Sequence, residues 1–125
     1  MNIRIKTTSY KLTAEAASYL DERLHAIEKF IGEHSDAARC EVEVGRASGH
    51  SEHGDVWRAE INLLHLGQNL RAESEAQSIN AAIDEVKDEI VRQLRRGKRL
   101  HIRLARRGGA LLKRFVRFGE EEEEE

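Results

Sequence analysis

Polar and apolar residues alternate in four separate stretches of the chain, and this alternation predicts short β-strands with one buried face. The predicted strands span residues 2–7, 39–45, 55–64 and 69–75. The third strand carries Trp57 on its apolar face, which predicts that the single tryptophan lies in the core. Between the last two strands, the residues His65-Leu66-Gly67-Gln68 predict a turn.

Two longer stretches repeat apolar residues every three or four positions, which is typical of amphipathic helices. The first helix is predicted to begin after the N-cap Thr13 and to end at Gly32, and the second is predicted to begin after Ser78. The pattern weakens after residue 94, where Gly97 interrupts it. We expect the second helix to continue to about Arg107 as an exposed basic extension, which Gly108-Gly109 ends. The two apolar stripes are Ala17, Leu20, Leu24, Ile27 and Ile31, and Ile79, Ala82, Ile83, Val86, Ile90 and Leu94.

The order of these elements, β-α-β-β-β-α, predicts an α+β fold with two layers. Three consecutive strands with short links favour an antiparallel meander, and the first strand joins it through a helical crossover. Both helices have a stripe to bury, so we expect them on one face of a four-stranded sheet. A chain of 125 residues makes one domain. We assign residues 1–96 to this domain and residues 97–125 to an extension that is disordered when free.

Charge is segregated along the chain, which the net charge of −2 hides. Residues 1–89 hold 10 Lys and Arg against 17 Asp and Glu, a balance of −7. Residues 90–119 hold 11 Lys and Arg and no acidic residue, and residues 120–125 are six glutamates. Eleven cations without an anion repel one another unless a polyanion is near. The basic run therefore favours contact with nucleic acid over a merely solvated face.

Arginine side chains bind phosphate oxygens with a planar pair of donors, and the affinity of such contacts falls steeply with salt. Contacts of this kind position a protein without reading base sequence. Specificity would then come from the shape of a folded RNA.

The C-terminal residues have competing interpretations. Phe115 and Phe118 lie among Lys113, Arg114 and Arg117, and they either stack on bases or belong to an unfolded tail. The glutamates 120–125 either fold back on the arginines as a phosphate mimic or only keep the tail soluble. In both cases the sequence favours the second interpretation.

Residues that carry chemistry are sparse. His50 and His53, with Glu52 and Asp55 nearby, do not complete a metal site. Cys40 is the only cysteine, so no internal disulfide forms, and it lies on an inward strand face where a thiol is inert. The apolar stretches are too short to span a membrane, and the N-terminus does not resemble a signal peptide. We therefore expect a cytoplasmic protein that is not an enzyme and has no metal, cofactor, small-molecule substrate or membrane partner.

The junction between the fourth strand and the second helix, residues 72–84, reads AESEAQSINAAID. It resembles the same junction in the ribosome hibernation factors, the family of hibernation promoting factor and ribosome-associated inhibitor A, also called protein Y. The resemblance continues in Asn2-Ile3-Arg4-Ile5, in Arg23-Leu24, in Glu28-Lys29-Phe30 and in Arg92-Gln93-Leu94. It covers roughly residues 2–96.

This resemblance implies a fold like that of a double-stranded-RNA-binding domain with an extra strand. It implies a free monomer that docks on the 30S subunit of the 70S ribosome, against 16S rRNA, over the tRNA and mRNA sites. The implied function is ribosome hibernation, in which occupancy inhibits translation under stress. The RNA-binding residues at matching positions are Arg23, Lys29, Arg92, Arg95 and Arg96, and the basic run adds Lys98, Arg99, Arg103, Arg106 and Arg107.

The chain departs from the family pattern at four positions. Asn80 stands where members usually have tyrosine, and Ser78 replaces the usual aspartate cap. Ala26 and Glu89 fall where some relatives carry lysine, which thins the basic face. We expect a short form of the family, without the dimerisation domain of the long form. The sequence does not decide between inactive single ribosomes and ribosome dimers.

Two other functions stay open at this point. A general double-stranded-RNA-binding or RNA-chaperone module would use the same basic run on any duplex. A protein-interaction module that modulates a transcription factor would make the arginine run incidental.

Overall fold

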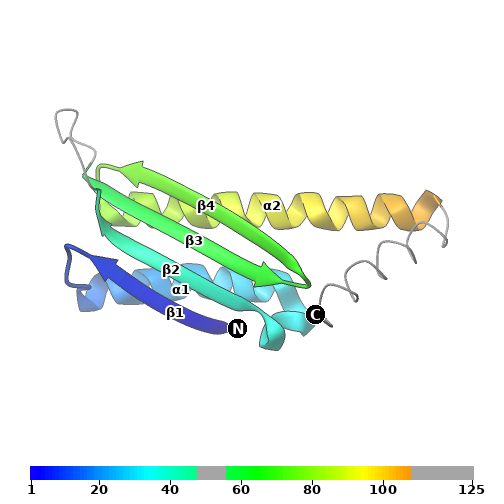
Figure 1. Ribbon diagram of the computed structural model, residues 1–125, viewed down its shortest axis with the longest axis horizontal. Coiled ribbons are helices and arrows are strands. Elements are labelled where there is room, and N and C mark those ends of the chain that lie inside the picture. The colour runs from blue at the N-terminus through cyan, green and yellow to red at the C-terminus, as the bar shows by residue number, and fades with distance from the viewer. Residues whose placement is uncertain (48–55, 108–125) are drawn as a thin grey trace.

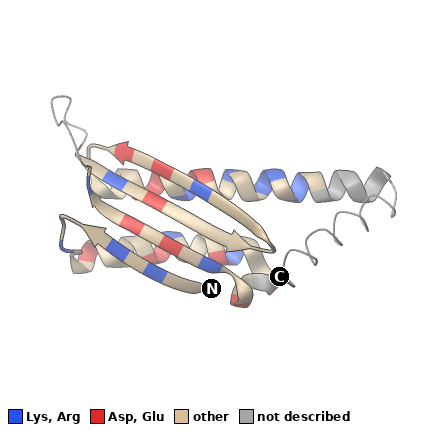
Figure 2. Cartoon of the chain, viewed as in Figure 1, with Lys and Arg blue, Asp and Glu red and all other residues tan. Residues whose placement is uncertain are grey.

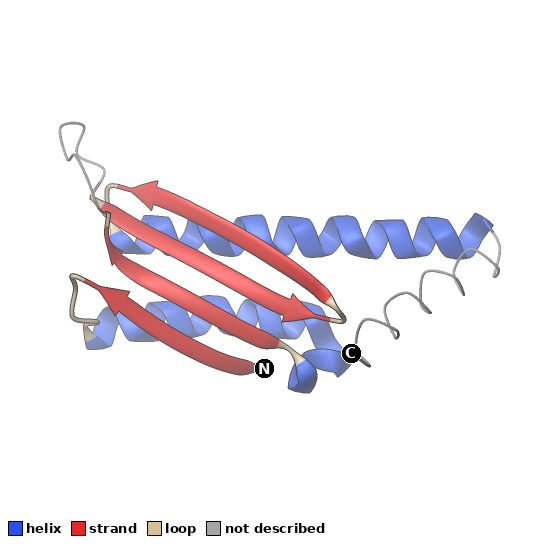
Figure 3. Cartoon of the chain, viewed as in Figure 1, coloured by secondary structure: helices blue, strands red, loops and turns tan. Residues whose placement is uncertain are grey.

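The computed structural model describes residues 1–47 and 56–107, with their side chains except those of residues 34 and 101–107. One sheet forms the front layer, and both helices lie behind it (Figure 1; Figure 3). This arrangement confirms the predicted two-layer α+β fold. Its elements are β1 (Asn2–Thr8), α1 (Ala14–Ile31), a 3₁₀ turn (Gly32–Ala37), β2 (Arg39–Arg46), β3 (Trp57–His65), β4 (Gln68–Ala76) and α2 (Ile79–Arg107).

The sheet has the strand order β1-β2-β3-β4. β1 pairs with β2 in parallel because α1 carries the chain back before β2 begins, and the other two pairings are antiparallel. A two-residue turn joins β3 to β4, with Leu66 at φ 51° and Gly67 at φ 75°. Two positive φ values in succession are the geometry of a type I′ hairpin, whose twist matches that of the strands.

Gly45 marks the place where β1 and β2 approach most closely. It pairs with Thr8, and a Cβ atom at position 45 would lie 2.1 Å from the Thr8 carbonyl oxygen. No larger residue fits there unless the backbone of β1 moves.

Both helices begin at the predicted caps. The Thr13 hydroxyl accepts a hydrogen bond from the Ala16 amide at 3.1 Å, and the Ser78 hydroxyl accepts one from the Ala81 amide at 3.1 Å. α1 ends at Gly32, whose φ of 74° suits a residue without a side chain.

The core lies between the sheet and the helices and is built of aliphatic side chains. Truncating one of the large core residues to alanine removes about 2–5 kcal/mol of stability. The small residues Ala72, Ala76 and Ala82 are buried where β4 and α2 lie close together. The largest fully buried side chains are Leu20, Leu24, Ile27, Ile61, Leu63, Ile83, Ile90, Val44, Val86 and Cys40.

The prediction that Trp57 lies in the core is wrong. Trp57 is the first residue of β3, and it is only partly buried, at the margin of the sheet. Its ring meets the edge of Tyr10, with centroids 5.1 Å apart, and the Arg46 guanidinium lies 5.1 Å from its centroid. The indole ring is therefore covered by Tyr10 and Arg46 rather than by a helix.

α2 runs through Gly97 to Arg107, which confirms the prediction that the helix continues past the weakened apolar pattern. One glycine costs a helix about 1 kcal/mol relative to alanine, which good helix formers on both sides offset. The predictions for His50, His53, Gly108-Gly109, the Phe115–Phe118 region and the glutamates 120–125 lie outside the described residues.

Candidate nucleic-acid interface

The exposed face of the sheet carries as many cations as anions. Alternation along the four strands directs ten charged side chains to this face, five basic and five acidic, and Figure 2 shows both signs side by side on neighbouring strands. Such a face has little net attraction for a polyanion. The basic residues are Arg4, Lys6, Arg39, Arg58 and Arg71, and the acidic residues are Glu41, Glu43, Glu60, Glu73 and Glu75.

Two arginines on this face are held by glutamates. Arg58 Nη2 lies 2.7 Å from Glu60 Oε2 and 2.7 Å from Glu73 Oε2, and Arg71 Nε lies 3.0 Å from Glu60 Oε1. The hydrogen bonds from Asn62 and Arg58 hold the pKa of Glu60 below its usual value, although burial opposes them. Glu60 therefore stays ionised and keeps both arginines occupied.

Along α2 the two signs are separated: the acidic residues lie between Asp84 and Glu89 and most of the basic residues follow them, as the change from red to blue in Figure 2 shows. Among the described side chains, ion pairs within α2 form only near the boundary, where Glu89 contacts Arg92 and Arg96 and Lys87 contacts Asp88. The helical layer therefore has a cationic end, which lies where α2 extends past the sheet (Figure 1).

A cluster of unpaired cations surrounds Phe30 in the last turns of α1. From α2, the Arg95 guanidinium lies 5.9 Å and the Lys98 ammonium 5.0 Å from the Phe30 ring centroid. Lys29 adjoins Phe30 and is exposed. Among the described residues, none of these three cations is paired with a carboxylate. We call Lys29, Phe30, Arg95 and Lys98 the Phe30 cluster.

Two other predicted cations on α2 are partly occupied. Arg92 and Arg96 both bind Glu89, the latter with Nη2 3.3 Å from Glu89 Oε1. Both arginines are exposed and keep donors that can face phosphate. Arg99 is exposed and, within the described part of the chain, bound to no carboxylate.

Arg23 holds α1 against α2. Its Nε lies 2.7 Å from Asp84 Oδ1, its guanidinium stacks 4.1 Å from the Tyr19 ring centroid, and the Tyr19 hydroxyl donates to Asp84 Oδ2 at 2.5 Å. Burial would raise the pKa of Asp84, but the hydrogen bonds from Tyr19 and Arg23 outweigh it and lower the pKa. Arg23 thus sets the spacing of the two helices that carry the Phe30 cluster.

Among the predicted RNA-binding residues whose side chains are described, Arg95 and Lys98 come together beside Phe30, Arg92 and Arg96 share Glu89, and Arg23 is bound to Asp84. Lys29 and Arg99 are exposed and, among the described residues, bound to no carboxylate. Arg103, Arg106 and Arg107 lie in the last turns of α2, where the side chains are not described.

Sequence reasoning missed the contacts that Phe30 and Asp84 make. For Phe30 a signal was present: it lies three residues after the buried Ile27, so it flanks the apolar stripe beside Lys29. For Asp84 there was none, because its partner Arg23 is 61 positions away.

Burial raises the pKa of the Cys40 thiol to about 12, so it stays protonated and unreactive. Across residues 1–47 and 56–107, no group of three or more His, Cys, Asp or Glu side chains is placed to hold a metal ion. Within the same ranges, no helix is both long and apolar enough to cross a membrane.

Most of the chain matches a known protein family. Residues 3–101 match the family described as Sigma 54 modulation protein / S30EA ribosomal protein. The chain belongs to this family. The family membership confirms the resemblance found in the sequence, and the matched residues include all of α1, α2 as far as residue 101, and the Phe30 cluster.

Two solved structures share the fold of this S30EA chain. The N-terminal domain of Thermus thermophilus Protein Y is 24% identical, with a TM-score of 0.61, over 77% of this chain and 98% of that one. A ribosomal subunit interface protein from Coxiella burnetii is 14% identical, with a TM-score of 0.63, over 78% and 98%. At these identities the likeness shows the fold alone. Among curated protein sequences, none matches the chain.

Proposed function

We propose that this protein is a ribosome hibernation factor that binds the small ribosomal subunit through the layer formed by α1 and α2. Membership of the S30EA family supports the ribosome as the partner. The observation that supports the choice of face is the difference in ion pairing. The cations of the Phe30 cluster are unpaired, whereas Arg58 and Arg71 of the sheet are held by glutamates.

The proposed mechanism is occupancy without chemistry, in the cytoplasm and under stress. The cations of α1 and α2 contact phosphates of 16S rRNA, and the bound domain excludes tRNA and mRNA from the decoding region. Release of counterions from the RNA would supply most of the affinity, so binding weakens as salt rises. The specificity would come from the fit of the two-layer domain to a folded RNA surface, because phosphate contacts do not read sequence.

The test is co-sedimentation of the full chain with purified 30S subunits over a series of salt concentrations. We expect saturable binding that falls steeply with salt, and that weakens when tRNA and mRNA are bound first. An unrelated RNA duplex at the same phosphate concentration is the control, and it should bind more weakly. Equal affinity per phosphate for the duplex would instead favour the general RNA-binding module. A protein that stays in the ribosome-free fractions at low salt would exclude the proposal.

A further inference from the structure

β1 is an edge strand whose outer side is open. It stands first in the sheet, and no other described strand lies beside it on that side. The Asn2 amide donates to the Ala38 carbonyl oxygen at 2.9 Å, which places the amides of even-numbered residues on the β2 side. Because successive backbone groups of a strand point in opposite directions, the N–H and C=O groups of Ile3, Ile5 and Thr7 point outward. Such a row of groups is a template for another strand.

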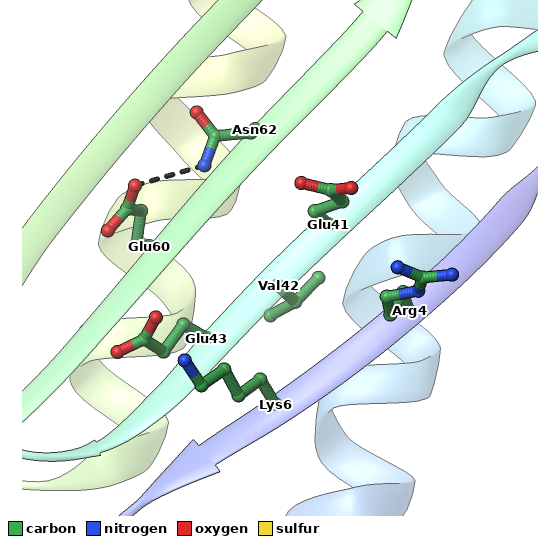
Figure 4. A pocket seen from close by; sticks show the side chains of 7 residues that line it. All are labelled: Arg4, Lys6, Glu41, Val42, Glu43, Glu60 and Asn62. Atoms are coloured by element: carbon green, nitrogen blue, oxygen red, sulfur yellow. Dashed lines mark hydrogen bonds between the residues drawn. The ribbon is translucent and has the colours of Figure 1, made fainter.

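The side chains of β1 add a chemical pattern to this edge. Ile3 and Ile5 are 41% and 43% exposed, although the residues that pair with them in β2 are buried. Arg4 and Lys6 point to the other face and, within the described part of the chain, form no ion pair. They border a depression of about 280 Å³ between β1, β2 and β3, which Figure 4 shows from close by. The edge thus offers apolar contacts on one face and cations on the other.

β2 shows which kind of strand satisfies this pattern. It sets Glu41 beside Arg4 and Glu43 beside Lys6, while apolar residues of β2 lie beside Ile3 and Ile5. A second strand on the outer side would meet the same four side chains. A strand that alternates acidic and apolar residues would therefore complement β1 on both faces.

At the opposite edge of the sheet, formed by β4, a side chain of α2 hinders the addition of another strand. The Gln93 side chain of α2 donates to the Arg71 carbonyl oxygen of β4 at 2.9 Å. A side chain that uses a carbonyl of β4 in this way hinders strand addition there. Among the described elements, none gives β1 such a guard.

We propose that β1 is a docking edge for an extended peptide segment of a partner protein in which acidic and apolar residues alternate. A second copy of this chain is a poor occupant, because pairing β1 with β1 sets Arg4 and Lys6 against the same cations of the other copy. The segment adds to the sheet as a fifth strand, with main-chain hydrogen bonds to Ile3, Ile5 and Thr7. This site is separate from the Phe30 cluster and does not rest on RNA binding.

The experiment titrates the full ¹⁵N-labelled chain with a synthetic peptide that alternates valine and glutamate, and it follows backbone amides by NMR. A peptide with lysine in place of glutamate is the control probe. We expect the amides of Ile3, Ile5 and Thr7 to shift and to gain protection from hydrogen exchange, with the acidic peptide only. Absence of binding, equal binding of the lysine peptide, or shifts centred on β4 would overturn the proposal.

Two variants test the contacts separately. Ile5→Pro removes an outward N–H and leaves the bonds to β2, a position where an edge strand tolerates proline, and it should abolish binding. Arg4→Gln/Lys6→Gln, which needs no backbone change, should weaken binding at least fivefold. The matched control Lys11→Gln/Arg39→Gln should leave it unchanged. Full affinity in both β1 variants, or sedimentation of the free chain as a β1-dependent dimer, would refute the proposed occupant. Ribosome binding by the same variants is measured in parallel, so that failure of either proposal is recognised by itself.

Discussion

The two faces of this domain contain the same kinds of charged residue but arrange them differently. On the exposed face of the sheet, Arg58 and Arg71 are bound by glutamates, whereas Arg4, Lys6 and Arg39 form no ion pair among the described residues. On α2, the acidic residues lie between Asp84 and Glu89, and the unpaired Arg95, Lys98 and Arg99 follow them, the first two beside Phe30. On this ground the helical face is the one proposed to receive phosphate.

Similar side chains therefore have different roles on the two faces. Arg58 stabilises the sheet, since Glu60 and Glu73 occupy its donors at 2.7 Å. Arg95 lies over Phe30, and its donors are left for a ligand. An RNA that approached Arg58 or Arg71 would have to displace glutamates, whereas one that approached Arg95 or Lys98 would not.

The strongest test removes two cations from each face. Arg95→Gln/Lys98→Gln should lower affinity for 30S subunits about tenfold or more and reduce the slope of log affinity against log salt by about two, because two phosphate contacts are lost. Arg4→Gln/Lys6→Gln removes the same charge from the sheet face and should leave 30S affinity unchanged. Filter binding over a salt series measures both quantities. Equal losses in the two double variants would mean that net charge, not the helical face, governs binding.

A second test converts the sheet into a cationic surface. Glu60→Gln/Glu73→Gln releases Arg58 and Arg71, and the affinity for an unrelated RNA duplex should rise about threefold or more. Glu41→Gln/Glu75→Gln adds the same charge, but neither glutamate is in an ion pair among the described residues, so it should have a smaller effect. An equal gain in both would show that pairing does not matter.

The same network predicts a pH dependence of stability. The pKa of Glu60 is lower in the folded chain than its usual value near 4.5, through its bonds with Asn62 and Arg58. Its contribution is therefore complete above that value and is lost as pH falls through the lower, folded pKa. Thermal unfolding between pH 6 and pH 3 should show a smaller acid loss in Glu60→Gln/Glu73→Gln than in the unmodified chain.

A smaller effect is expected from the contact that sets the spacing of the helices. Asp84→Asn weakens the bonds from Arg23 and Tyr19 and should lower the melting temperature by about 3 °C, since partly exposed ion pairs contribute little. It should also lower 30S affinity slightly, because the Phe30 cluster contains residues of both helices. Asp21→Asn is the control, an exposed carboxylate of α1 without an ion pair among the described residues. Calorimetry at neutral pH compares them, and a melting temperature unchanged by Asp84→Asn would contradict the assigned role.

The sequence predicted the fold well because each element has its own period. Alternation located the strands, and steps of three and four located the helices and their caps at Thr13 and Ser78. The misplacement of Trp57 has a physical reason: alternation tells which face a residue takes but not whether the core reaches that end of the strand.

The candidate site was predicted less completely. The basic run identified the cations, but it did not separate paired from unpaired ones. For Arg92 the ion pair could have been predicted, because Glu89 lies three residues earlier, on the same side of a helix. For Arg23 the pairing could not be predicted, since its partner Asp84 comes from another helix. For Arg58, Glu60 two residues later in β3 was a signal, but Glu73 of β4 was not. Tertiary pairing of this kind has no signal in the order of residues.

The smallest expected effect concerns the turn between β3 and β4, which itself carries no cation. Leu66 holds φ 51° and is 54% exposed, so its side chain gains little burial for a backbone conformation that leucine disfavours. Leu66→Asn creates the Asn-Gly pair that type I′ turns prefer and should raise stability by about 0.5–1 kcal/mol in urea unfolding. Leu64→Asn, at an exposed position of β3 two residues earlier, should bring no gain. Because the turn carries no cation, 30S affinity should stay the same in both variants; a loss in Leu66→Asn alone would mean that the strained leucine contacts the partner and that the binding surface extends from the helices to the end of the sheet.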